Sequence, residues 1–186
     1  MISANRERDP SPVFPLGLAY LAGPVEEAGH ASRLLDLCFA EDVPAALRTA
    51  LDEYRPDVVL VSIRNLDNVT WPSSRSYVEG VREVVALCRE RSAVVLGGSA
   101  FSLEPHSLLA ATGATCGVVG EGEDVLPRLL ERIEAGATLQ GLPGVVVAGS
   151  GEPAPPHIPS SVGTPRRDLF DVSRYLTEGG AANVQT

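Results

Sequence analysis

The chain has 186 residues, enough for one α/β domain with a tail rather than two full domains. Its formal net charge is −9 and all of its basic residues are arginine, so it lacks the basic stripe that nucleic-acid binding requires. No apolar run approaches the roughly 18 residues of a membrane span, and the charged amino terminus is unlike a signal peptide. We therefore expect a cytoplasmic protein with neither a nucleic-acid nor a membrane partner. Cys38, Cys88 and Cys116 are far apart in apolar contexts, which predicts buried thiols.

Short apolar runs alternate with segments of helical periodicity, which is the pattern of a parallel sheet with crossover helices. The predicted strands cover residues 2–5 (a short, clipped first strand), 32–37, 58–62, 93–98 and 116–120, and residues 144–148 are a candidate further edge strand. The predicted helices cover residues 16–29, 43–54, 73–91, 104–112 and 123–135. We therefore predict an α/β fold with five parallel strands, doubly wound, and helices on both faces of the sheet.

The composition changes after residue 148. Residues 149–167 contain five prolines and little periodicity, which is typical of a linker or an arm rather than a core. Residues 168–186 regain some aromatic content but end in EGGAANVQT. We therefore predict a folded domain over residues 1–148 and a Pro-rich arm over residues 149–186.

Four loops are candidates for function, because doubly wound sheets bind ligands outside the carboxyl ends of their strands. They are residues 5–15, 62–72, 97–105 and 120–123. The fourth predicted strand is followed by GGSAFS and the fifth by GEGE. Bare backbone at several strand ends predicts a wide, shallow surface for a large ligand rather than a pocket for a small acid.

Several common ligand classes lack their signatures here. No G-x-G-x-x-G occupies the first strand–helix turn, and at Gly120-Glu121-Gly122 the carboxylates of Glu121 and Glu123 disfavour the phosphates of NAD or ATP. The P-loop and the receiver-domain site each require a lysine, and GGSAF does not match the G-x-S-x-G elbow of a hydrolase. The histidines share no metal-ligand spacing: we predict His30 as a helix-end cap or surface residue, His106 as exposed, and His157 as part of the arm.

Four motifs in order carry a family resemblance: PLGLAYLAGPVEEAGH, RPDVVLVSIRNLDN, VVLGGSAFSLEP and GVVGEGE. Together they resemble the N-terminal cobalamin-binding domain of cobalamin-dependent radical S-adenosylmethionine (SAM) enzymes. The resemblance covers roughly residues 14–130, and the tail YLTEGGAANVQT resembles the lead-in to the radical SAM domain of those enzymes.

The resemblance implies a flavodoxin-like fold that holds the corrin against the strand ends. Bare backbone at Gly97 and Gly98 would admit the dimethylbenzimidazole tail, and Ser99, Phe101 and Ser102 would line its channel. Side chains at Gly97 and Gly98 should therefore block the tail while leaving the fold largely intact. The implied cofactor-binding residues are Asn5, Ser62, Ile63, Arg64, Asn65, Gly97, Gly98, Ser99, Phe101, Ser102, Val119, Gly120, Glu121 and Gly122.

The chain departs from the pattern in two ways. Residues 5–15 contain no histidine, so we expect base-off cobalamin without a protein histidine beneath the cobalt. Arg64 or Asn65 could lie there, although a salt bridge between Arg64 and Asp67 or a hydrogen bond that stabilises the loop is an equal alternative. The C-x-x-x-C-x-x-C motif that ligates the 4Fe-4S cluster is absent, so SAM and the cluster would belong to an absent C-terminal radical SAM domain.

The resemblance favours a module that positions methylcobalamin for methyl transfer to a substrate carbon radical. We expect no catalytic and no metal-ligating residue in this chain, because its task would be positioning. The alternatives are a stand-alone cobalamin carrier or sensor, and a flavodoxin-like domain that binds a flavin or a nucleotide.

Overall fold

The computed structural model describes residues 1–151, 155, 158–159 and 163–179, and its centre is a six-stranded sheet. The strand order is β2 (Leu35–Asp36), β1 (Ile2–Ser3), β3 (Val58–Ser62), β4 (Ala93–Gly97), β5 (Cys116–Val118) and β6 (Val145–Val147). Strands β1 to β5 are parallel, and the candidate edge strand is present as β6, antiparallel to β5. The predicted doubly wound, flavodoxin-like α/β fold is confirmed, and its strand order reverses between β1 and β3.

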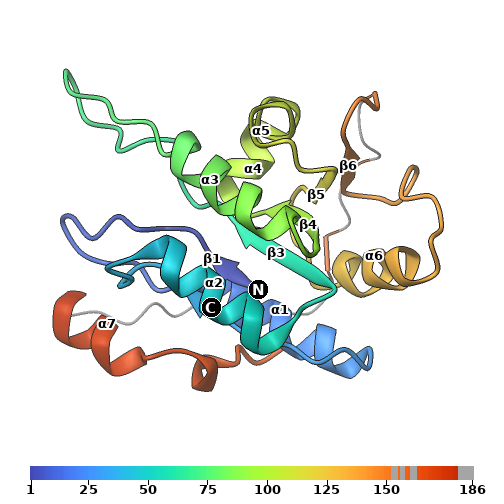
Figure 1. Ribbon diagram of the computed structural model, residues 1–186, viewed down its shortest axis with the longest axis horizontal. Coiled ribbons are helices and arrows are strands. Elements are labelled where there is room, and N and C mark those ends of the chain that lie inside the picture. The colour runs from blue at the N-terminus through green and yellow to red at the C-terminus, as the bar shows by residue number, and fades with distance from the viewer. Residues whose placement is uncertain (152–154, 156–157, 160–162, 180–186) are drawn as a thin grey trace.

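Helices cover both faces of the sheet (Figure 1). One face carries α2 (Val43–Tyr54), α3 (Val78–Arg89), α4 (Ser99–Leu103) and α5 (Pro105–Thr112), and the other carries α1 (Leu16–Glu27) and α6 (Val125–Glu134). Side chains alternate along β3, so Val59 and Val61 pack under the first group of helices and Leu60 packs under the second. The three cysteines are buried free thiols, as predicted.

Helix α2 begins and ends where local sequence signals place it. The Asp42 side chain accepts a hydrogen bond from the amide of Ala45 at 2.9 Å, and Pro44 lies in the first turn. At the other end Arg55 adopts a left-handed conformation, and its amide bonds the Leu51 carbonyl at 3.0 Å. The predicted range of residues 43–54 is therefore confirmed.

Helix α3 begins at Val78, so the prediction that it begins at residue 73 is wrong. Residues 67–76 form a hairpin-like loop that projects from the domain (Figure 1), with an antiparallel bridge between Asp67 and Ser76. The Asn68 side chain stabilises it by accepting from the Arg75 amide at 2.8 Å and donating to the Ser73 carbonyl at 3.3 Å. These side-chain bonds give the backbone an alternative to the first turns of a helix.

The segment after β4 also differs from prediction. Helix α4 begins directly after Gly98, the helical conformation is interrupted at Glu104, and α5 begins at Pro105.

The prediction that His106 is exposed is wrong, because its side chain is half-buried. The prediction for His157 lies outside the described residues. Within the described ranges, no helix combines the length and the apolar character that a bilayer crossing needs.

Part of the Pro-rich arm packs on the domain. The amide of Arg166 bonds the Ala19 carbonyl of α1 at 2.8 Å, and its guanidinium pairs with Glu26. A 3-10 turn (Arg167–Leu169) then leads to α7 (Val172–Gly179), which lies beside the loops after β1 and β2 (Figure 1). The arm is thus ordered over residues 163–179 and shares a small core with α1.

Tyr175 of α7 is the centre of that small core. Its side chain is only 2% exposed, and its ring lies 5.4 Å from the Phe14 ring and 4.9 Å from the Phe39 ring. The hydroxyl donates to the Asp36 carboxylate at the end of β2, at 2.6 Å. Burial and the Asp36 carboxylate raise the pKa of Tyr175, so the hydroxyl keeps its proton and remains a donor.

We expect Tyr175→Phe to lower the free energy of unfolding by about 1–3 kcal/mol, because it leaves the Asp36 carboxylate without this donor. Urea denaturation of both proteins measures the effect. Tyr54→Phe is the matched control, since that side chain is 47% exposed. Equal stability of the two variants would contradict a structural role for the Tyr175 hydroxyl.

Candidate functional site

The predicted loops meet at one edge of the sheet, where the parallel strands end. The register pairs Ser3 with Ser62 and Ser62 with Gly97, so β1, β3 and β4 end level with one another. β5 follows on the far side of β4, and its last residue is Val118. The residues that follow these strands therefore surround the switch point between β1 and β3.

The loops after β3 and β4 are joined through their backbones. The Ile63 amide donates to the Gly97 carbonyl at 2.8 Å, and the Ala100 amide donates to the Ile63 carbonyl at 3.0 Å. The Ser99 hydroxyl adds a bond to the Arg64 carbonyl at 2.7 Å. Ile63 itself is buried, so it presents backbone rather than side chain at this junction.

Gly98 makes this junction possible. Its φ is +94°, and a Cβ there would lie 2.6 Å from the Ile63 carbonyl oxygen. Gly97 is different, because the nearest atom to a Cβ at that position is the Val118 carbonyl oxygen at 3.9 Å. Gly98 is thus required by the protein's own packing, whereas a Cβ at Gly97 would make only an ordinary van der Waals contact.

Ser102 connects the loop after β4 to the loop after β5. Its hydroxyl donates to the Gly98 carbonyl at 3.1 Å and accepts from the Gly120 amide at 3.0 Å. Val119 is half-buried, and its amide bonds the Gly144 carbonyl at 2.8 Å, which ties the same loop to the start of β6. These bonds fix the carboxyl end of β5 relative to β4.

Phe101 lies in the core beneath this surface. Its side chain is 0% exposed. A Cβ on Gly117 would come within 2.3 Å of the ring, so Phe101 packs directly on the backbone of β5. This contradicts the prediction that Phe101 lines an open channel. The sequence did not predict this role of Gly117, although a glycine inside a strand is a known signal of close packing.

Arg64 and Asn65 follow the buried end of β3. Arg64 is exposed, and in the amide orientation that satisfies both groups Asn65 accepts from the Arg64 guanidinium at 3.3 Å. Among the described residues no ion pair joins Arg64 to Asp67; the Asp67 carboxylate instead accepts from the Val69 amide at 2.8 Å. Arg64 is therefore an exposed residue whose guanidinium forms a hydrogen bond within its own loop, the second form of the predicted alternative.

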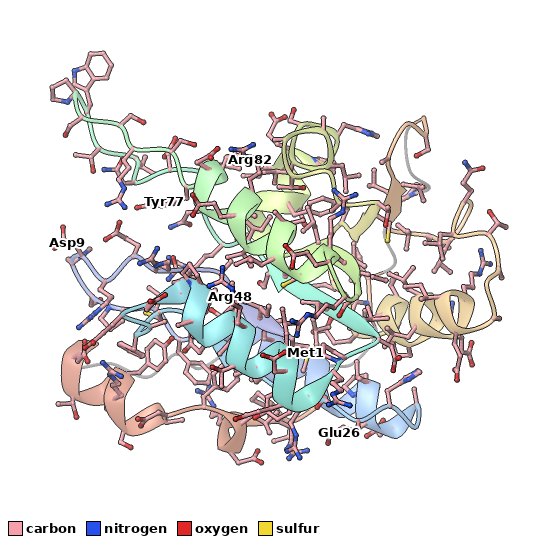
Figure 2. All side chains as sticks on the ribbon, in the orientation of Figure 1. Met1, Asp9, Glu26, Arg48, Tyr77 and Arg82 are labelled. Atoms are coloured by element: carbon pink, nitrogen blue, oxygen red, sulfur yellow. The ribbon has the colours of Figure 1, made fainter. Side chains whose placement is uncertain are left out.

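A hydrogen bond that the sequence did not predict joins the loops after β1 and β3. The Tyr77 hydroxyl donates to the Glu7 carboxylate, and Figure 2 shows Tyr77 on the side facing the loop that carries Asp9. This bond lowers the pKa of Glu7, while burial and the Glu7 carboxylate raise the pKa of Tyr77 to about 12. The predicted residue Asn5 is half-buried in the same loop and donates to the Glu7 carbonyl at 3.4 Å.

The GEGE loop presents less charge than its sequence suggests. Glu121 is exposed, whereas Glu123 is 7% exposed, and burial raises the pKa of its carboxyl group. One Glu123 carboxyl oxygen is buried without a hydrogen-bond partner in the described part of the chain. A Cβ on Gly122 would lie 3.0 Å from a terminal methyl group of Leu21 in α1, so this glycine lies close against that helix. The same described residues contain no group of His, Cys, Asp and Glu side chains arranged to hold a metal ion.

The structure predicts that an alanine substitution has different effects on stability at the two neighbouring glycines, Gly97 and Gly98. We expect Gly98→Ala to lower the free energy of unfolding by about 2 kcal/mol or more, because of backbone strain and the clash with Ile63. Gly97→Ala should leave stability within about 1 kcal/mol of the parent. This corrects the expectation that both glycines can be substituted without harm to the fold. Thermal unfolding checks it, and equal midpoints for the two variants would contradict it.

Comparisons with known proteins agree with this geometry. Residues 3–130 match the B12 binding domain family. The chain is 33% identical over 141 residues to tryptophan 2-C-methyltransferase of Streptomyces laurentii, covering 73% of this chain and 24% of that protein. It is 32% identical over 164 residues to hopanoid C-3 methylase of Methylococcus capsulatus, covering 86% of this chain and 30% of that protein.

Solved structures give the same result. The radical SAM methyltransferase TsrM from Kitasatospora setae, with cobalamin and a [4Fe-4S] cluster bound, matches with a TM-score of 0.73 and 32% identity, over 78% of this chain and 28% of that one. The cobalamin-dependent radical enzyme OxsB shares the fold, with a TM-score of 0.73 at 17% identity over 94% of this chain and 25% of that one. The chain spans between 24% and 30% of the lengths of these relatives. It belongs to the B12-binding domain family.

Proposed function

We propose that this chain is the cobalamin-binding module of a cobalamin-dependent radical SAM methyltransferase. The observation that carries the proposal is the open backbone at Gly97, set among the joined loops that follow β3, β4 and β5. Two curated relatives are named as a methyltransferase and a methylase, and the TsrM structure contains cobalamin. Cobalamin is broad and carries neutral amides around its rim, so it suits a surface of backbone, hydroxyl and glycine.

The described residues fit such a group. Gly97 would leave room for the nucleotide tail, and the GEG loop would flank it on the β5 side. Ser62, Arg64, Asn65 and Ser99 would border the corrin after β3 and β4, and Asn5 would approach from the loop after β1. Ile63, Gly98, Ser102 and Val119 would act indirectly, because their contacts hold these loops in place.

Cobalamin supplies, when bound, a methyl group that can be transferred to carbon. The task of this chain is to bind and orient that cofactor, and none of its residues acts as an acid, a base or a nucleophile in our proposal. No histidine lies in the loop after β1, so we propose base-off cobalamin without a histidine from this chain on the cobalt. SAM and the 4Fe-4S cluster would be bound by a C-terminal radical SAM domain, because C-x-x-x-C-x-x-C is absent from these residues.

We expect the purified protein to retain hydroxocobalamin after incubation and desalting. The visible absorbance should correspond to one cobalamin per protein molecule. Gly97→Val should reduce retention at least tenfold while the thermal midpoint without ligand changes little, since a Cβ at Gly97 meets only the Val118 carbonyl oxygen, at 3.9 Å. Gly80→Val is the control, because a Cβ at Gly80 would have no neighbour within 4 Å and Gly80 lies in α3, away from the strand ends. A colourless parent protein would refute the proposal, and a flavin or nucleotide retained instead would support the flavodoxin-like alternative.

We further expect Arg64→Ala to change the visible spectrum of bound cobalamin, because this exposed guanidinium would lie beneath the corrin. A cation there disfavours an added lower ligand, so its loss should favour a water or buffer ligand on the cobalt. Arg82→Ala is the control, since Arg82 pairs with Glu79 on the surface of α3. An Arg64→Ala spectrum identical to that of the parent would argue against this placement.

A further inference from the structure

Helix α7 lies along the second half of the loop that joins β1 to α1, residues 4–15. The buried Phe14 ring lies 5.4 Å from the Tyr175 ring, and a Cβ added to Gly179 would lie 3.3 Å from the carbonyl oxygen of the buried Pro12. Figure 1 shows α7 on the side of the domain toward which this loop projects. The end of the loop that leads into α1 is therefore packed against α7.

The first half of the same loop reaches α7 through one charged cluster. The Glu178 carboxylate pairs with Arg8 of the loop and, one helical turn back, with Arg174 at 2.9 Å. Both guanidinium groups also lie over the Phe39 ring, that of Arg8 at 5.4 Å and that of Arg174 at 4.2 Å from its centroid. The Arg174 guanidinium, together with that of Arg8, lowers the pKa of Glu178, so the carboxylate is charged at neutral pH. One carboxylate thus joins two cations that contact the same ring.

The preceding residue of the loop is held from the other side. Glu7 accepts from the Tyr77 hydroxyl, which belongs to the segment before α3. The Glu7 carboxylate also accepts from the amides of Arg8 and Asp9, each at 3.1 Å. Glu7 and Arg8 therefore anchor the loop between two segments that are far apart in the sequence. Asn5 lies between this anchor and the end of β1, so its position depends on both.

The contact between Arg8 and Glu178 matters more for the loop than for the fold. The two side chains are 49% and 26% exposed, and an exposed ion pair contributes little to the stability of a whole domain. The same pair can still select one conformation of a loop whose alternatives are close in energy. A ligand that binds only that conformation then binds more weakly in proportion to the fraction of molecules that leave it.

We propose that Glu178 is a positioning residue for the cofactor, through which α7 holds the loop after β1 in the conformation that lets Asn5 border the corrin. This role rests on the proposed function. It assigns residues 163–179 to the cobalamin-binding unit, although their composition is that of a linker. Breaking the charged cluster frees the loop to leave that conformation, so cobalamin binds more weakly while the sheet and its helices stay folded.

The test measures hydroxocobalamin binding by the full chain. Glu178→Arg leaves three guanidinium groups around Phe39 without a carboxylate, and we expect the apparent Kd to rise at least about fivefold. Arg8→Glu combined with Glu178→Arg exchanges the two charges, so the cluster again contains one carboxylate and two guanidinium groups. Binding should then return to within about twofold of the parent. Asp52→Arg is the matched control, because Asp52 also pairs with an exposed arginine, Arg91, but lies at the opposite edge of the sheet.

Hydrogen exchange without cobalamin measures the loop itself. The amides of residues 4–14 should exchange faster in Glu178→Arg than in the parent, and the exchanged charges should restore their protection, while the amides of β4 serve as the internal reference. The thermal midpoint of Glu178→Arg should stay within about 3 °C of the parent, since the pair is exposed. Glu178→Gln removes the charge without adding one, and should show the same changes to a smaller extent even if Glu178→Arg folds poorly.

The outcomes separate this role from the proposed function. A parent that binds cobalamin, with the same Kd and the same loop exchange in Glu178→Arg, would overturn the role of Glu178 alone. A loss of binding that the exchanged charges do not rescue would overturn it as well, because the added arginine and not the missing pair would then disturb the site. A parent that binds no cobalamin would refute the proposed function and, with it, the role of Glu178 in binding.

Discussion

The close approach of two backbones at Gly98 determines the arrangement of the ligand edge. No side chain fits where Gly98 meets Ile63, so the chain can turn from β4 directly into α4. That turn places Phe101 against Gly117 and Ser102 against Gly120. The loops after β3, β4 and β5 are consequently fixed to one another before any ligand is present, which reduces the ordering cost of binding.

The same arrangement engages several of the charges near this edge. Arg8 pairs with Glu178 of α7 and Glu123 is buried with a raised pKa, whereas Glu7 accepts from Tyr77 and stays ionised because that bond lowers its pKa. Besides the exposed Arg64 and Glu121, which carry opposite charges, the polar atoms at the strand ends include backbone groups and the hydroxyls of Ser99 and Ser102. Such groups can form hydrogen bonds with amides at little electrostatic cost, whereas a phosphate-binding loop would need amides and cations directed at one point.

The sequence predicted the elements whose signals are local. β3, β4 and α2 follow from β-branched runs and from the Asp42 cap, and the positions of the site loops follow from the parallel topology. The start of α3 and the burial of Phe101 were not predictable in this way. The start of α3 depends on the bonds of the Asn68 side chain within its own loop, which compete with helix formation but leave no periodic signal. The burial of Phe101 depends on its packing against Gly117, which lies in strand β5. The order of α7 depends likewise on Tyr175 reaching Asp36, which composition cannot reveal.

The loop that follows β1 receives little support from the strand that precedes it. β1 is only two residues long, yet its carboxyl end leads into the loop that carries Asn5 and Glu7. That loop is held from outside, by Tyr77 on one side and by Glu178 on the other, rather than by a long strand behind it. The position of the ligand loop after β1 therefore depends on these two contacts, one from the loop before α3 and one from the arm, rather than on the length of β1.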